Sequence, residues 1–287
     1  MHHVSPCHAW RWKEPDETDE QYADRLAQEL DDKINDLGPE TVAAFVCEPV
    51  VGATMGAVPA VEGYLKKIKA VCERHGVLMI LDEVMCGMGR TGWLYACLED
   101  GVEPDMITIA KGLGAGYQPI GALLVSGQIF KAVEAGSGFF QHGHTYMGHP
   151  TACAAANAVL DRVIGDDLLS NVRVRGEELR TALTGRFGNH PNIGDIRGRG
   201  LFLGMEIVAD RGTKEPFDPA RGINKAIKKR AMEEGLMCYP MGGTIDGQRG
   251  DHILLAPPFI LTSDQVGEIT DKLERAMAPV LEQARAA

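Results

Sequence analysis

Apolar residues follow two alternating patterns in the first part of the chain. Between Asp19 and Leu37 they recur every four positions, at Tyr22, Leu26, Leu30 and Ile34. That spacing predicts a helix with one apolar face. Short continuous apolar runs, separated by further helical stretches, occupy 42–46, 77–81, 106–110 and 120–125. Such runs predict buried strands, so we expect an α/β fold with a mixed, mostly parallel sheet covered on both faces.

The pattern changes near Pro191. Two helical stretches precede this residue, one ending at about Ile164 and one over 167–185. After it, 193–208 predicts a strand punctuated by glycines, and short strands at 236–239 and 253–256 mix with two helices. We therefore expect two domains, a partial large domain over 1–190 and a small C-terminal α+β domain over 191–287.

Composition narrows the classes of function. The 287 residues are 45% hydrophobic and 24% charged, with a net charge of −11, which disfavours nucleic acid and anionic membranes as partners. No apolar run reaches the ~18 residues of a membrane span. Seven cysteines are scattered without a C-x-x-C pair, which favours reduced thiols in a cytoplasmic protein over disulfides or a metal site.

Lys111 stands where the apolar run 106–110 ends and a glycine-rich turn begins. In an open parallel sheet, the carboxyl ends of the strands face the crevice where ligands bind. A partly desolvated amine there loses its proton readily and can attack a carbonyl. The alternative is a lysine that ends a strand and extends into water.

Asp82 also ends an apolar run, 29 residues before Lys111. A buried carboxylate needs a cationic or hydrogen-bonding partner, and the protonated ring nitrogen of a pyridine is one such partner. An ion pair with an arginine, for example Arg90, is the alternative. Two ionisable groups of opposite sign at strand ends favour a ligand between them.

Four stretches, taken together and in this order, resemble the class III aminotransferases, which are pyridoxal-phosphate enzymes of fold type I. They are Leu81-Asp82-Glu83-Val84, Gly87-Met88-Gly89-Arg90-Thr91-Gly92, Ile107-Thr108-Ile109-Ala110-Lys111-Gly112 and Thr145-Tyr146-Met147-Gly148-His149-Pro150. The likeness extends over essentially the whole chain. It implies the fold type I transferase architecture and pyridoxal 5′-phosphate (PLP) as the cofactor.

The resemblance also implies roles for matching positions. Lys111 would form the Schiff base with the cofactor and move the substrate proton, and Asp82 would bind the pyridine nitrogen. Val84 would pack on the ring face, or be an ordinary core valine. Thr145 would hydrogen-bond the phosphate from the other subunit of a homodimer, or make only a local turn bond.

Three further residues are candidates for substrate binding. Arg197 resembles the mobile arginine that grips a substrate carboxylate through a bidentate pair, and Arg199 is a rival for that role. Glu48 resembles the glutamate that pairs with this arginine when the substrate has no second carboxylate. The alternatives are a surface arginine and a carboxylate that ends a strand.

The sequence departs from the family pattern in two respects. It has no Gly-Ser-Glu-Ala type phosphate loop and only four predicted central strands where the family has seven, so it resembles the C-terminal two-thirds of an aminotransferase. Met85-Cys86 follow Asp-Glu-Val where many members have Gln. An apolar residue there resembles the branch that acts on amines or ω-amino acids with pyruvate.

We therefore expect a PLP-dependent transaminase that moves an amino group from an amine or ω-amino acid to an oxo acid such as pyruvate. An aminomutase or decarboxylase of the same fold is an alternative. A second alternative is a non-catalytic remnant or a subunit that needs a partner. Because the phosphate loop is missing from these 287 residues, we expect weak PLP binding and poor solubility.

Overall fold

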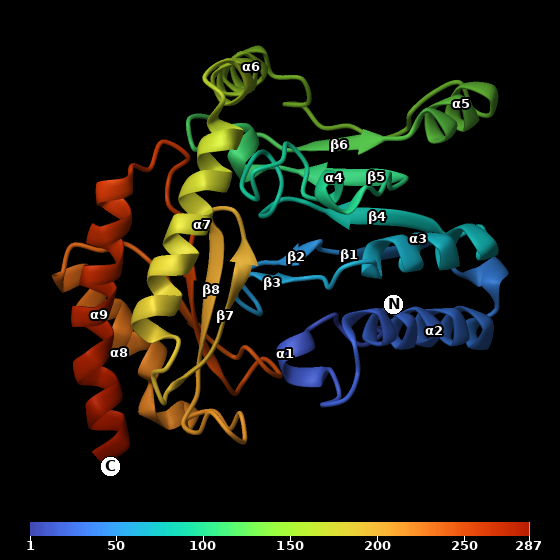
Figure 1. Cartoon of the computed structure of the whole chain (residues 1–287). Coiled ribbons are helices and arrows are strands. Elements are labelled where there is room, and N and C mark those ends of the chain that lie inside the picture. The colour runs from blue at the N-terminus through green and yellow to red at the C-terminus, as the bar shows by residue number, and fades with distance from the viewer. Residues whose placement is uncertain (287) are drawn as a thin grey trace. The chain divides into compact units, whose positions relative to one another are not determined.

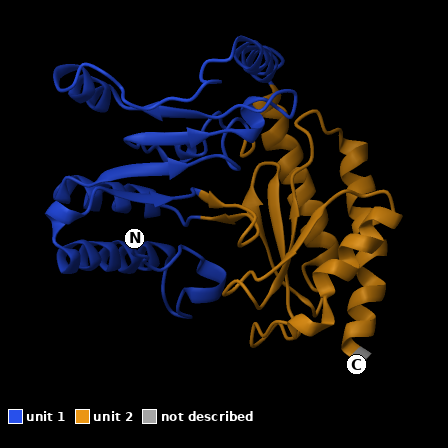
Figure 2. Ribbon diagram, turned by 180° about the vertical axis from the view of Figure 1, so that it is seen from behind, with its two compact units in different colours: residues 1–49, 60–89, 93–167 blue, residues 50–59, 90–92, 168–287 orange. Residues whose placement is uncertain are grey.

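The computed structural model describes residues 1–286 and divides into two compact units (Figures 1 and 2). The first unit comprises Met1–Pro49, Ala60–Gly89 and Trp93–Asp167. The second comprises Val50–Pro59, Arg90–Gly92 and the chain from Leu168 onward. Each unit has its own sheet and its own hydrophobic core.

The first unit is built on a four-stranded sheet in the order β1-β4-β5-β6. β1, β4 and β5 are parallel, and β6 is antiparallel to β5. The predicted mixed, mostly parallel sheet of four strands is therefore confirmed, with each strand within two residues of its expected position. The strands are β1 (Ala44–Cys47), β4 (Leu78–Asp82), β5 (Met106–Ile109) and β6 (Ala122–Val125).

Two amphipathic helices form most of the first core, and they lie side by side in Figure 1. α2 (Asp19–Leu37) coincides with the predicted helix, and it begins at a capping box in which Thr18 and Gln21 bond each other's backbone N–H. Its apolar stripe packs with α3 (Tyr64–His75) and the sheet. The other helical segments of this unit are α1 (Ala9–Trp12), η1 (Pro39–Thr41), α4 (Cys97–Asp100), η2 (Lys111–Leu113), α5 (Gly127–Ala135) and α6 (Pro150–Gly165).

The second unit contains an antiparallel sheet in the order β7-β8-β10-β9. The single strand predicted over 193–208 is wrong, because the chain reverses at Gly200 and forms a hairpin. Gly200 has φ +54°, and a Cβ there would lie 2.5 Å from the carbonyl carbon of Thr91, so only glycine fits. The strands are β7 (Ile193–Arg199), β8 (Phe202–Ile207), β9 (Tyr239–Gly242) and β10 (Asp251–Leu255).

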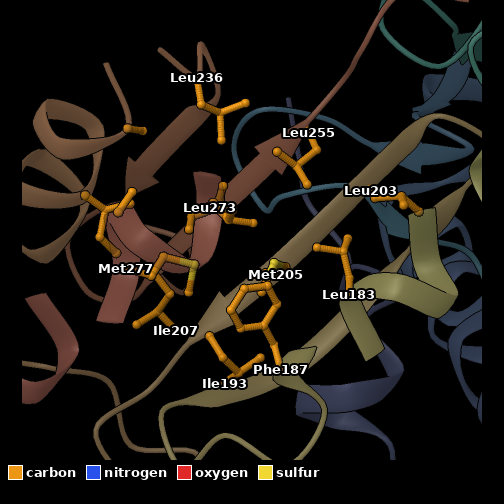
Figure 3. Close-up of a cluster of buried hydrophobic side chains, with 14 of the residues drawn as sticks. Leu183, Phe187, Ile193, Leu203, Met205, Ile207, Leu236, Leu255, Leu273 and Met277 are labelled. Atoms are coloured by element: carbon orange, nitrogen blue, oxygen red, sulfur yellow. The ribbon is translucent and has the colours of Figure 1, made fainter. Parts of the chain in front are cut away.

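Three helices and a short hairpin complete the second unit. The helices bury apolar side chains against the sheet, and Figure 3 shows Leu183 and Phe187 of one helix among residues of β7, β8, β10 and the last helix. Among the described helices, none is both long and apolar enough to cross a membrane. The elements are α7 (Leu168–Phe187), α8 (Ile223–Glu233), α9 (Ser263–Ala286), η3 (Pro219–Arg221), β2 (Val50–Val51) and β3 (Val58–Pro59).

The division between the units differs from the predicted boundary at residue 190. α7 belongs to the second unit because it packs on β7 and α9 and contributes Leu179, Leu183 and Phe187 to that core. The hairpin β2–β3 also belongs to the second unit, although it follows β1 directly in sequence.

Candidate active site

The carboxyl ends of three parallel strands bring predicted site residues to one edge of the first sheet. Cys47 pairs with Leu81, so Glu48 and Asp82 follow at the same level of β1 and β4. Asp82 in turn pairs with Thr108 of β5, three residues before Lys111. Neighbouring strands lie about 4.8 Å apart, so the backbones that carry these groups are close.

Asp82 has one carboxylate oxygen in use and one available. Its Oδ1 accepts a hydrogen bond from the backbone N–H of Val84 at 3.0 Å, whereas Oδ2 has no hydrogen-bond partner among the described residues. The alternative ion pair with Arg90 does not form. Arg90 donates instead to the carbonyls of Leu201 (3.1 Å) and Pro257 (2.6 Å) in the second unit.

Lys111 presents its amine at the end of β5. The residue is exposed, and its backbone has φ +39°, a conformation that is unusual for a residue with a side chain and is found at functional sites. Gly112 behind it packs against Met88, where a Cβ would lie 2.9 Å from the Met88 Cβ. Within residues 1–286 the amine makes no hydrogen bond or ion pair, so it is available to react.

Glu83 is a site residue to which the sequence analysis gave no role. Its buried carboxylate accepts hydrogen bonds from the backbone N–H groups of Ala96 (2.6 Å) and Cys97 (2.9 Å). Burial raises the pKa of Glu83. These bonds tie the start of the segment after Asp82 to the start of α4. The sequence signal for Glu83 is its position as the second of two acidic residues at the end of an apolar run.

Thr108 is a second residue to which the sequence alone gave no individual role. Its Oγ1 is buried and has no hydrogen-bond partner in the described structure, and the residue is the register partner of Asp82. Buried hydroxyls are nearly always paired, so an orphan beside a strand-end carboxylate indicates a group available to a ligand or water.

Neither Thr145 nor Arg197 belongs to the strands of the first sheet. Thr145 belongs to a stretch, 136–149, in which every residue is exposed, and its hydroxyl bonds no described residue. Arg197 is in β7 of the second unit and is 7% exposed. Its guanidinium donates to two carboxylates and two backbone carbonyls, a setting that opposes the mobility expected of a substrate-gripping arginine.

The residues present fit the ring side of a pyridoxal cofactor. Lys111 offers an amine for a carbonyl carbon, and Asp82 offers an open carboxylate oxygen for a ring N–H. Val84 is half-buried next to this carboxylate. The orphan hydroxyl of Thr108 adds one more polar group at the same strand ends.

An open α/β sheet with a lysine and carboxylates at its strand ends is an arrangement typical of ligand-binding sites in α/β proteins. Comparison with known proteins gives the family. Residues 2–277 match the family model described as aminotransferase class-III, and the chain belongs to this family.

Named relatives agree with this assignment. An aminotransferase of Gibberella zeae is 46% identical over 98% of this chain, and a gamma aminobutyrate transaminase 3 of Solanum lycopersicum is 36% identical over 96% of it. This chain covers 55% and 52% of those two proteins. It thus spans little more than half of their length.

Solved structures give the same fold. An (S)-enantioselective ω-transaminase from Thermomicrobium roseum is 36% identical with a TM-score of 0.90, over 98% of this chain and 60% of that one. An ω-aminotransferase from Paracoccus denitrificans is 38% identical with a TM-score of 0.90. The predicted transferase fold is therefore confirmed. Members of the class III family depend on PLP, and the ω-transaminase of Pseudomonas jessenii was solved in complex with PMP.

Proposed function

We propose that this chain carries the catalytic lysine of a PLP-dependent transaminase, with Lys111 as that lysine. The observation that carries the proposal is the unpaired Lys111 amine at the end of β5, next to the strand end where Asp82 leaves Oδ2 open. The class of reaction is inferred from the family. The nearness of Asp82 and Lys111 is inferred from the register of β4 with β5.

Each residue at the strand ends has a defined task in this proposal. When bound, the cofactor supplies an electron sink for the pair of electrons released as a substrate C–H bond breaks. The Lys111 amine would hold the cofactor and would afterwards take and return the substrate proton. Asp82 would keep the ring nitrogen protonated by accepting its N–H with the open oxygen, and Val84 would pack against the ring.

The proposed donor is an amine or ω-amino acid, and the proposed acceptor is an oxo acid such as pyruvate. Support comes from Met85-Cys86 after Asp82-Glu83-Val84 and from relatives named as ω-transaminases and gamma-aminobutyrate transaminases. Glu48 follows β1 at the level of Asp82 on the neighbouring strand. When the donor has no second carboxylate, the Glu48 carboxylate can pair with the cation that would otherwise bind that carboxylate.

We also propose a homodimer in which Thr145 serves the cofactor phosphate of the other subunit. The stretch 136–149 is exposed throughout and contains Phe139, Phe140 and Tyr146, each more than half exposed. Large apolar side chains gathered on one stretch are typical of an interaction surface.

All seven cysteines are free thiols, which supports a reducing compartment such as the cytoplasm.

The test is the absorption spectrum of the purified chain mixed with PLP. With PLP in large excess, to offset the weak binding expected of these 287 residues, wild-type protein should show a visible band that borohydride removes by fixing the cofactor to the protein. Mass spectrometry of the digested protein should then find the reduced adduct on Lys111. Lys111→Ala should lack both the band and the adduct.

A surface lysine provides the matched control. Lys131 lies exposed on α5, and Lys131→Ala should behave as wild type. Adducts spread over several surface lysines, or a band that survives in Lys111→Ala, would contradict the proposal. Transamination products from a set of amine donors would separate this activity from that of a decarboxylase or aminomutase.

The second candidate is a subunit that becomes competent only with further polypeptide. The observation that favours it is β6, where all four residues are exposed, including Leu123 and Val125 at 49% and 43%. A folded, monodisperse chain with no PLP band would support this candidate over the first.

A further inference from the structure

Arg197 is a buried arginine whose hydrogen bonds are all to fixed groups of the second unit. Its Nη2 donates to Glu206 Oε2 at 2.5 Å and to the Met55 carbonyl at 2.5 Å. Its Nε donates to the Gly56 carbonyl at 2.9 Å, and its Nη1 to Asp195 Oδ2 at 3.1 Å. Four acceptors thus surround one guanidinium, which has five N–H groups.

Two of these acceptors belong to the loop between β2 and β3, residues 52–57. The loop is closed on itself, because the N–H groups of Gly56 and Ala57 both donate to the Gly52 carbonyl. Residues of β8 and β10 also pack closely against the loop. A Cβ on Gly204 would lie 2.0 Å from the Gly56 carbonyl oxygen, and a Cβ on Gly56 would lie 2.6 Å from the His252 ring.

A substrate-gripping role would require Arg197 to leave this setting. Glu206 is fully buried, and its carboxylate would then lose an ion-pair partner that helps to offset its burial. Removing one partner of a buried ion pair is strongly destabilising, because the other charge stays uncompensated. The two loop carbonyls would lose their donors at the same time.

We propose that Arg197 is a positioning residue, which holds the loop 52–57 through the carbonyls of Met55 and Gly56 while Glu206 and Asp195 fix its guanidinium. The loop begins four residues after Glu48 in the sequence. The part of this inference that concerns substrate rests on the proposed function: Arg197 does not itself bind the substrate carboxylate. The part that concerns the loop does not depend on it.

The first test is hydrogen exchange of the loop amides, measured by mass spectrometry on the full chain. Arg197→Lys keeps a positive charge beside Glu206 but cannot reproduce the planar fork that spans two carbonyls. The amides of Gly56 and Ala57 should then exchange about tenfold faster or more, while those of α2 in the first unit stay unchanged.

The matched control is Arg186→Lys, the same change at a surface ion pair with Asp271 on α9. It should leave loop exchange at the wild-type rate. If Arg197→Lys does not fold, Glu206→Gln replaces it, since it keeps the shape and an acceptor but loses the charge. Wild-type loop exchange in a folded Arg197→Lys or Glu206→Gln protein would overturn the proposal.

The second test compares two amine donors, one with a carboxylate and one without. With Arg197→Lys, the ratio of their KM values should stay within about twofold of wild type, because a displaced loop affects both donors alike. A rise of tenfold or more confined to the carboxylate donor would overturn the proposal. If the wild-type chain transaminates neither donor, the proposed function fails, and the exchange result still decides the role of Arg197 in the loop.

Discussion

At the scale of single residues, the positions of the second unit that tolerate least change are those where backbone meets backbone. Gly204 of β8 lies under the loop 52–57, and there is no space for a side chain between them. Gly56 has φ +76° and meets a side chain instead, because a Cβ there would lie 2.6 Å from the His252 ring. Apolar patterning cannot reveal such contacts, because they join residues 148 and 196 positions apart (204 − 56 and 252 − 56).

Gly204→Ala should destabilise the protein by about 3 kcal/mol, because the new Cβ can be accommodated only by a backbone shift. Urea unfolding followed by circular dichroism measures this difference. Gly267→Ala on α9 is the control: no atom lies within 4 Å of its new Cβ, so it should be neutral or stabilise by up to about 1 kcal/mol. Equal unfolding midpoints for the two variants would show that the β8–loop contact is not rigid.

His252 should make the stability depend on pH. Burial, with the nearby positive charge of Arg197, lowers the pKa of His252 to about 4. Between its ordinary pKa of about 6.5 and pH 4, the unfolded chain therefore holds a proton on this residue that the folded chain lacks, and stability falls as the pH falls. The loss from pH 7 to pH 5 should be about 2 kcal/mol.

The measurement is the free energy of unfolding at pH 7 and pH 5 for wild type and His252→Phe. The variant removes the titrating ring nitrogens, so its loss over that range should be smaller by about 2 kcal/mol. His142→Asn, at an exposed histidine, should retain the wild-type pH dependence. An unchanged slope in His252→Phe would assign the acid sensitivity to other groups.

At the scale of elements, β6 is the least covered part of the first sheet. One of its edges pairs with β5, and no described strand pairs with the other. Leu123, Leu124 and Val125 are between 37% and 49% exposed. An open strand edge with apolar side chains is a template for association with another chain.

Leu123→Lys should therefore reduce concentration-dependent self-association of the purified chain, since a charge on the edge strand opposes pairing. Sedimentation velocity over a range of protein concentrations measures the effect. Leu98→Lys on α4 changes an equally exposed leucine and should leave the distribution as in wild type. Identical behaviour of the two variants would mean that association does not involve β6.

The elements that could be predicted were those with a strong local signal. α2 was placed to the residue because its apolar stripe is regular, and in the structure a capping box and Gly38 lie at its two ends. The β7–β8 hairpin was taken as one strand because apolar residues occur on both sides of Gly200, and the close contact that favours glycine at the turn is a tertiary one. α5 was missed because its residues are largely exposed and its apolar positions pack against little.

At the scale of the whole molecule, the α/β class, the mixed sheet and the family followed from strand-like runs and four ordered motifs. The strand-end placement of Asp82 and Lys111 also followed, because strand ends are visible in the sequence. The assignment of residues 50–59, 90–92 and 168–187 to the second unit could not be predicted, since it depends on packing between distant segments. The buried setting of Arg197 was hidden for the same reason.

The second unit is assembled from three separate stretches of the chain, and two of them are ten residues or shorter. A gene segment that encodes only residues from 168 onward would thus lack the carbonyls that Arg197 binds and the loop that Gly204 supports. Recombination that exchanges this unit between relatives must transfer all three stretches together. A single crossover near residue 168 joins the Arg197 side of one ancestor to the loop of another, so compatibility at Met55 and Gly56 decides whether the hybrid folds.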